Sequence, residues 1–328
     1  MSPLFGRAQG RQAKKNRGES TIAVLDIESG SVASGLVRIS PNHKPQLLGQ
    51  DRRALSTRRA PSAEVLLNEI EREIEESLLR LSGLTSRMRS VGVPNDIDRI
   101  AVFLHAPWIT VSLLDNRAKA DAHDAILEQL RDASRVLNEV PVTFHAFATT
   151  TTPIIHGLFN APQESLVISI GSEVAELSLL RGNNTVGYAT VPAGLSTVLR
   201  TLESHAGVSR PQALSILNLS RSSREHAWAE ALAAGVGQVT KELRQSTKSL
   251  LSELKGTQQI FVVAQHPTSD FFARMLTEDP GVHELFAPGS TIRAVSPKHA
   301  TPYLSAHPQK PDVPLLLESL FVDTRFGS

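Results

Sequence analysis

Two segments of this chain follow the same plan, and that repeat constrains the fold more than any other feature of the sequence. VLDIESGSVASGLV at residues 24–37 and VISIGSEVAELSLL at residues 167–180 each join two apolar stretches through a turn of small and polar residues. Such a pattern predicts a strand–turn–strand hairpin, and we expect hairpins at residues 21–39 and 165–191, the second turn being one residue tighter. Each copy would open a sheet of its own in a two-lobed α/β protein.

Hydrophobic periodicity elsewhere predicts the elements that complete the two lobes. Apolar residues at intervals of three and four indicate helices, and short apolar runs rich in β-branched residues indicate buried strands. Residues 50–60 are polar and basic and are predicted to be a linker. We expect helices at 62–81, 120–140, 195–206, 211–217, 225–254 and 267–276, strands at 100–104, 108–114, 142–147 and 260–264, and a short helix or strand at 315–322. Residues 51–150 would then form a compact α+β unit between the two hairpins.

The bulk composition restricts the classes of function. A formal net charge of +1 over 328 residues gives no general attraction to nucleic acid or to anionic lipid. The chain has no cysteine, which excludes disulfides, thiolate metal sites and a cysteine nucleophile. No apolar run approaches the roughly 20 residues of a membrane span, and the N-terminus lacks the apolar stretch of a signal peptide. We therefore expect a cytoplasmic protein that does not bind nucleic acid.

The first 18 residues differ from the rest of the chain because they are basic and contain no acid. Their composition predicts a disordered tail. One interpretation is a solubilising tail, and the other is weak contact with anionic lipid, since each basic residue near such a surface contributes about 1 kcal/mol. The basic residues are Arg7, Arg11, Lys14, Lys15 and Arg17.

Searches for common catalytic and metal-binding motifs give no match. The eleven histidines form no HExxH or HxH pattern, so structural or surface roles are expected for them. The sequence also lacks GxxxxGK[ST], GxGxxG and GxSxG, which argues against a P-loop, a Rossmann dinucleotide site and a nucleophile elbow. His105 and Trp108 lie at a predicted strand turn, where packing is favoured over ligand contact. A solvated linker is favoured over an anion-binding role for four arginines, Arg52, Arg53, Arg58 and Arg59.

The order and spacing of these segments over residues 20–327 resemble the actin-like ATPase superfamily, and within it the FtsA and type IV pilus PilM families. The resemblance implies a two-lobed α/β fold of duplicated ribonuclease-H-like lobes, with a small inserted α+β subdomain in the first lobe and a nucleotide cleft between the lobes. The hairpins then resemble the two phosphate loops, and PAGLST at 192–197 resembles the segment that leads into the next helix. The nucleotide-cleft residues implied by the resemblance, as a vestigial or weak site, are Asp26, Ser29, Ser31, Gly171, Ser172 and Gly194.

The resemblance also implies how the chain divides. Residues 1–19 are the basic tail, and residues 20–50 open the first lobe with the first phosphate-loop-like hairpin. Residues 51–160 contain the inserted subdomain and the return to the first lobe. Residues 161–310 form the second lobe, and residues 311–328 pack back on the first lobe.

All three loops that face nucleotide in this family depart from its pattern here. Ser169 stands where the second loop begins with Asp, Glu28 stands where the first loop has Gly, and Ala264-Gln265 stands where the adenosine loop has Gly-Gly. Phosphate loops bind through backbone N–H groups that glycine lets the ligand approach closely, so side chains at Glu28 and Glu173 obstruct it. Each carboxylate about 4 Å from a polyphosphate charge would add a few kcal/mol of repulsion. Only Asp26 remains of the usual acidic pair for magnesium.

The leading hypothesis is therefore a non-catalytic actin-fold scaffold, similar to PilM and FtsA, peripheral at the cytoplasmic face of the inner membrane in type IV pilus or related assembly. It would need no cofactor, and its partner would be an inner-membrane assembly protein or the cytoplasmic peptide of one, with self-association also open. The alternative is an active actin-like ATPase that polymerises or anchors a cell-division complex and uses ATP with magnesium at Asp26. Glu173 or Glu176 would then replace the missing acid of the second loop. The side chain of Glu176 is, however, expected to point away from the cleft. A sugar-kinase-like relative is a third interpretation, which the absent glycine-rich adenosine loop disfavours.

Overall fold

The computed structural model describes residues 18–55, 63–90, 96–114, 117–128, 130, 140–161, 164–219, 228–251, 259–265 and 268–327. The basic residues of the expected tail, Arg58, Arg59 and the second half of the expected adenosine loop (266–267) lie outside the described residues.

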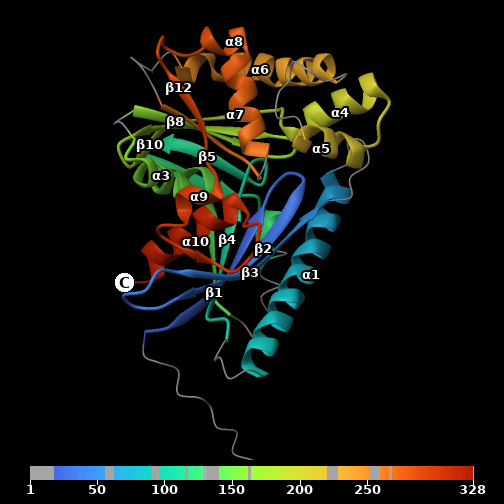
Figure 1. Ribbon diagram of the computed structural model, residues 1–328. Helices are drawn as coiled ribbons and strands as arrows, with labels where there is room; N and C mark the ends of the chain where they lie inside the picture. Colours follow the sequence, from blue (N-terminus) through green and yellow to red (C-terminus); the bar gives the residue numbers. More distant parts are fainter. Residues whose placement is uncertain are drawn as a thin grey trace, which may run out of the picture.

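Two sheets form the two lobes, the first below the second in Figure 1, and they share one order of five strands to which the first sheet adds β13. In each sheet three antiparallel strands are followed by two that run parallel to the first strand of the lobe. The first sheet has the order β13 (Ser305–Ala306), β3 (Gln46–Ala54), β2 (Ser31–Ile39), β1 (Ser20–Ile27), β4 (Arg99–Leu104) and β7 (Val142–Ala146). The second has the order β10 (Asn184–Val191), β9 (Ala175–Arg181), β8 (Glu164–Ile170), β11 (Gln259–Val263) and β12 (Thr291–Ala294). The predicted duplication of the α/β lobes is thus confirmed.

The two predicted hairpins, β1–β2 and β8–β9, have the same register. Ile27 pairs with Val32 in the first hairpin and Ile170 with Ala175 in the second. Four residues therefore separate the last paired residues in both, and the expectation of a tighter second turn is wrong. Val174, apolar and β-branched, gave the appearance of a strand residue but lies in the turn.

Helices cover the outer faces of both sheets, and two helices lie between them. α1 (Ala63–Ser90) packs on the first sheet through apolar residues three and four apart, including Ile70, Ile74, Leu78 and Leu81. α4 (Leu195–Ala206), α5 (Arg210–Leu219), α6 (Ala229–Leu251) and α7 (Thr268–Glu278) cover the second sheet. α3 (Phe147–Phe159) and α10 (Val313–Phe326) lie between the lobes (Figure 1). Two further helices, α8 (Pro280–His283) and α9 (Pro297–Ala300), are short, and residues 124–128 are also helical.

α10 is the element that joins the two lobes. It is buried on nearly every side, which is the pattern of a helix enclosed by protein rather than one lying on a surface. Leu315, Leu316 and Leu320 belong to the core under the first sheet, whereas Val313 and Leu317 belong to the core under the second. This helix is the end of the chain that was predicted as a short helix or strand packing back on the first lobe.

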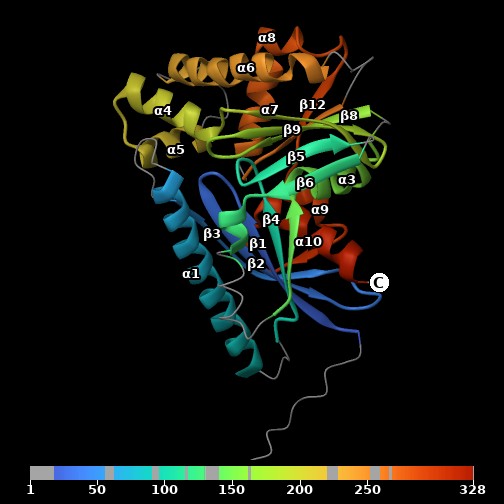
Figure 2. The ribbon, with the colours of Figure 1, turned by 180° about the vertical axis from the view of Figure 1, so that it is seen from behind.

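The region expected to form an inserted α+β unit is arranged differently. β4 and β7 are inner and edge strands of the first sheet, and residues 46–54 form β3 where a linker was expected. Residues 120–122, expected to begin a helix, instead belong to β6 (Arg117–Ala122), which pairs with β5 (Ile109–Leu114) as a separate hairpin. That hairpin packs against β10 of the second lobe, as Figure 2 shows from behind. β3 was not predicted as a strand because its side chains are polar and partly exposed. They remain partly exposed because only the short β13 lies beyond β3 in the sheet.

Among the described helices, none is both long enough and apolar enough to cross a bilayer.

Candidate functional site

The turns of the two hairpins touch each other between the lobes. A Cβ atom added to Gly30 would lie only 2.4 Å from the Cβ atom of Ser172, so the backbone of one turn rests on the side chain of the other. The backbone N–H of Glu173 donates to Ser29 Oγ at 3.0 Å. Gln265 Nε2 donates to Ser31 Oγ at 3.4 Å from the turn after β11. The residues predicted to form the phosphate-loop-like turns of the two lobes therefore lie in direct contact with each other.

Asp26 lies near the end of β1 and is fully buried behind these turns. Its Oδ2 accepts from Arg52 Nη2 at 2.5 Å, and its Oδ1 lies 2.8 Å from His105 Nε2. Burial alone would raise the pKa of Asp26, but the charges of Arg52 and His105 outweigh it and hold this pKa below its ordinary value. Asp26 is therefore a carboxylate that already has two cationic partners within the protein.

Arg52 is a buried ion-pair centre, and the expectation that it belongs to a solvated linker is wrong. Its guanidinium reaches Glu28 Oε1 at 3.2 Å in addition to Asp26, and binds Asp312 through two bonds of 2.7 and 2.9 Å. Burial opposes its charge, yet the three carboxylates raise the pKa of Arg52 well above its usual value. Arg53, the next residue on β3, faces away and pairs with Asp51 at the surface.

Asp312 carries this network to α10. It is the N-cap of that helix, where its side chain accepts from the backbone N–H of Leu315 at 3.1 Å. Gln50 adds two bonds to the same segment, donating to the carbonyl of Lys310 at 2.7 Å and accepting from the N–H of Asp312 at 2.9 Å. The start of the central helix is thus tied to β3.

His105 connects the two lobes. It follows β4, and its Nδ1 lies 2.9 Å from Glu176 Oε2 on β9. Glu176 Oε1 also accepts from the backbone N–H of Ala106 at 3.2 Å and from the hydroxyl of Tyr188 at 2.6 Å. Burial disfavours a charged imidazole, but Asp26 and Glu176 together raise the pKa of His105 well above its usual value. His105 therefore bridges one carboxylate of each lobe.

The strand register shows that Glu176 supplies an acid in the second lobe, next to Ser169, which stands where the family has Asp. Asp26 pairs with Ala33 in the first hairpin, and the equivalent pair in the second is Ser169 with Glu176. Residues opposite each other in a sheet share a face, so Glu176 occupies the same face as Ser169 and points toward the first lobe, against expectation. Glu173, by contrast, is at the surface and pairs with Arg200 at 2.8 Å.

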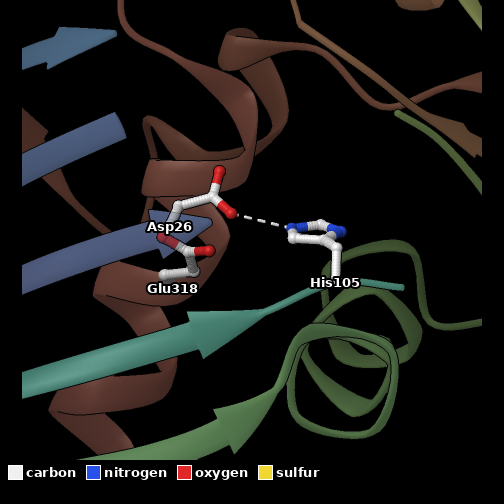
Figure 3. A group of neighbouring side chains, drawn as sticks. All are labelled: Asp26, His105 and Glu318. Carbon is white, nitrogen blue, oxygen red and sulfur yellow. Dashed lines mark ion pairs between the residues drawn. The ribbon is translucent and has the colours of Figure 1, made fainter. Parts of the chain in front are cut away.

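Glu318 completes the buried cluster from α10. Figure 3 shows its carboxyl group beside Asp26 and across from His105. The side chain is fully buried, and neither of its oxygens has a hydrogen-bond partner among the described residues. Burial, reinforced by the charge of Asp26, raises the pKa of Glu318 well above its usual value. Glu318 could not be predicted as a site residue, because a single acid in an apolar segment belongs to no motif and its neighbours come from distant parts of the chain.

The first turn of α4 is occupied by the second hairpin. The backbone N–H groups of Leu195 and Ser196 donate to the carbonyls of Gly171 at 3.0 Å and Ser172 at 2.8 Å. Gly194 permits this contact, since a Cβ atom there would lie 2.4 Å from the Gly171 carbonyl oxygen. The N–H groups at a helix start are those that commonly hold anions, and here two of them bind the loop itself.

A cavity of about 640 Å³ lies outside the touching turns. Ser31 and Ser172 border it from the hairpins, and Leu195, Arg210 and Leu214 border it from α4 and α5. Asp26, His105 and Glu176 do not line it. The charged cluster is therefore separated from the cavity by the turns and by Arg52.

Comparison with known proteins gives a fold and no closer assignment. No family model matches the sequence, and no curated protein matches it. Among solved structures, a chain of the PilM–PilN type IV pilus biogenesis complex is 16% identical, with 94% of this chain and 98% of that chain covered and a TM-score of 0.62. The ethanolamine utilization protein EutJ from Carboxydothermus hydrogenoformans is 11% identical, with 92% and 90% covered and a TM-score of 0.58. This chain has the two-lobed actin-like fold. The resemblance predicted from the two hairpins is confirmed at the level of the fold.

Proposed function

We propose that this protein is a non-catalytic actin-fold scaffold. The observation that carries the proposal is the contact of Gly30 with Ser172, which leaves no room for a phosphate group between the two hairpin turns. Behind that contact, Asp26 is paired with Arg52 and His105 instead of facing an open cleft. The groups that would manage magnesium and phosphate in an ATPase thus hold the lobes together.

Separating the two hairpin turns to admit a phosphate group would be costly, which supports the same proposal. A polyphosphate entering between the turns would have to displace the Glu173 to Ser29 bond and the bonds between the second turn and α4. It would also approach Glu28, which is buried and lies beside Asp26. Each such carboxylate, about 4 Å from a phosphate charge, adds a few kcal/mol of repulsion at an effective dielectric near 20.

A membrane-assembly role is proposed from the structural likeness. A chain of the PilM–PilN type IV pilus biogenesis complex shares the fold over nearly the whole length of both chains. On this proposal the protein is peripheral at the cytoplasmic face of the inner membrane and holds a cytoplasmic segment of an inner-membrane assembly protein. The cavity beside α4 and α5 would receive that segment, because Leu195, Leu199 and Leu214 offer it apolar contacts and Arg210 a charged one.

Cross-linking from the cavity tests the scaffold role. A photo-activatable residue at Leu214, which is 36% exposed at the cavity wall, is expected to capture an inner-membrane protein through its cytoplasmic segment. The same residue at the exposed Tyr303, which does not line the cavity, serves as the matched control. A synthetic peptide of the captured segment should then bind the purified protein without nucleotide. Equal capture from both positions, or a peptide that binds only with ATP, would contradict the proposal.

The same cavity favours a second candidate, an active actin-like ATPase that polymerises or anchors a cell-division complex. Its volume of about 640 Å³ and its position beside Ser31, Ser172 and Gln265 would suit a nucleotide that lies outside the closed turns. This candidate predicts light scattering that increases with ATP. The scaffold predicts no scattering change with ATP.

A further inference from the structure

Three possible metal-ligand atoms converge at the buried centre of the molecule. Asp26 comes from β1, His105 from the segment after β4 and Glu318 from α10 (Figure 3). One oxygen or nitrogen atom of each lies within 4.8 Å of the other two. The three segments are far apart in the sequence, so the cluster exists only in the folded chain.

Glu318 is the observation that points to a ligand. A buried carboxyl group normally has hydrogen-bond partners, because leaving such a group unsatisfied is energetically costly. Glu318 is fully buried, and no described group donates to either of its oxygens. Asp26 Oδ1 and His105 Nε2 also lack a hydrogen bond of good geometry among the described residues, although they lie 2.8 Å apart. The unpartnered carboxyl group of Glu318 therefore lies beside the Asp26–His105 pair.

The surroundings of His105 are those of a metal-binding histidine. A ligating imidazole usually donates its other N–H to a carboxylate, which fixes the tautomer and the ring orientation. Here Nδ1 lies 2.9 Å from Glu176, and Glu176 is itself held by Tyr188 and by the backbone of Ala106. The ring also stacks on Phe147 with centroids 4.1 Å apart. His105 Nε2 is thereby directed at Asp26 and Glu318.

We infer that Asp26, His105 and Glu318 bind one divalent transition-metal ion, in the absence of nucleotide. One imidazole and two carboxylates form a donor set suited to Zn²⁺ or Mn²⁺, whereas Mg²⁺ and Ca²⁺ prefer oxygen ligands alone. Ligands about 2.1 Å from a tetrahedral ion are about 3.4 Å apart, so shifts of about an ångström would complete the site. Arg52 holds Asp26 Oδ2 and leaves Oδ1 for the metal.

Such an ion would fasten three parts of the fold. Asp26 and His105 belong to the first lobe, Glu176 extends the site into the second, and Glu318 places it on the helix between them. The site needs neither the hairpin turns nor a membrane partner, so its failure would leave the scaffold proposal untouched.

The test is zinc binding by the full-length protein after treatment with a chelator. Titration calorimetry with ZnCl₂ is expected to give one tight site per chain, and thermal unfolding should shift upward with added zinc. X-ray absorption at the zinc edge should show a single histidine ligand. Absence of binding at micromolar zinc would overturn the inference.

Glu318→Gln is the decisive variant, because it keeps the shape of the side chain and replaces a carboxylate ligand by a weakly coordinating amide. It should fold with unchanged metal-free melting temperature and lose at least 10-fold in zinc affinity. Glu176→Gln, which removes the carboxylate charge behind His105, should lose about 10- to 100-fold. His43→Gln removes an exposed histidine and should bind as the unaltered chain does. Equal affinity in Glu318→Gln and the unaltered chain would place the zinc elsewhere and refute the site.

Discussion

Replacing Arg52 by methionine should destabilise the protein more than any exposed substitution nearby. Methionine keeps the unbranched side chain as far as the position of Nε and removes the charged guanidinium group. It leaves Asp26, Glu28 and Asp312 in a buried region without their shared cation. The side chain of Arg52 is only 12% exposed, so solvent cannot replace it.

The magnitude follows from the ion pairs. A single pair about 4 Å apart is worth about 4 kcal/mol at an effective dielectric of 20, and the desolvation of both charges offsets much of this. Removing one partner of a buried pair costs about 3–5 kcal/mol, because the remaining charge is left uncompensated. We expect Arg52→Met to lose about that much. Arg53→Met, on the same strand but with a side chain 53% exposed, should change stability by no more than about 0.5 kcal/mol.

Urea unfolding at pH 7.5, followed by circular dichroism, measures both variants. The deficit of Arg52→Met should shrink at pH 5. The pKa of Glu28 is already raised by burial, and loss of Arg52 would raise it further, so this carboxylate is neutralised as the pH falls. A loss below about 1 kcal/mol, or one equal to that of Arg53→Met, would refute the role of Arg52 as the shared partner of the three acids.

Further predictions concern packing and pH. Gly30→Ala should cost about 1–3 kcal/mol by pushing the two turns apart, and Ser172→Gly in the same chain should recover most of it in thermal unfolding. Gly237→Ala, where a Cβ atom meets open space in α6, should instead stabilise by about 0.5–1 kcal/mol; destabilisation there would contradict the packing described. Burial, with nearby positive charge, lowers the pKa of His145 to about 4, so the unfolded chain takes up a proton between pH 7 and pH 5 that the folded chain does not. The free energy of unfolding should fall by about 1–2 kcal/mol from pH 7 to pH 5, after a discount for the partial exposure of His145. His145→Gln should abolish this loss, whereas the exposed His43→Gln should not. Equal pH profiles of stability in the two variants would refute the assignment.

The fold could be predicted because its strongest signals are local. Each hairpin combines two apolar strands with a small-residue turn, and two copies of that pattern indicated the duplicated lobes. The helix at Leu195–Ala206 was predicted with its observed bounds, since Gly194 and Gly207 mark its ends. β3 and β6 were missed because both are polar strands, whose register depends on a neighbouring strand rather than on their own residues.

The site could be predicted only in part. Asp26 and the turn residues were found because the hairpins point to them. Arg52, His105 and Glu318 were not, since their roles depend on contacts between segments far apart in the chain. Arg52 was interpreted together with Arg53, yet strand alternation places the two on opposite faces of β3. Recognising β3 as a strand would have been enough to separate them.

The most direct test of the central claim is a titration of the purified full-length protein with magnesium-ATP by calorimetry. If the contact between the two hairpin turns closes the cleft to phosphate, no binding of micromolar affinity should be observed. The melting temperature should also not respond to millimolar magnesium-ATP. Micromolar binding of magnesium-ATP, together with a higher melting temperature in its presence, would contradict the account, because it would show that a phosphate group can enter between the two turns.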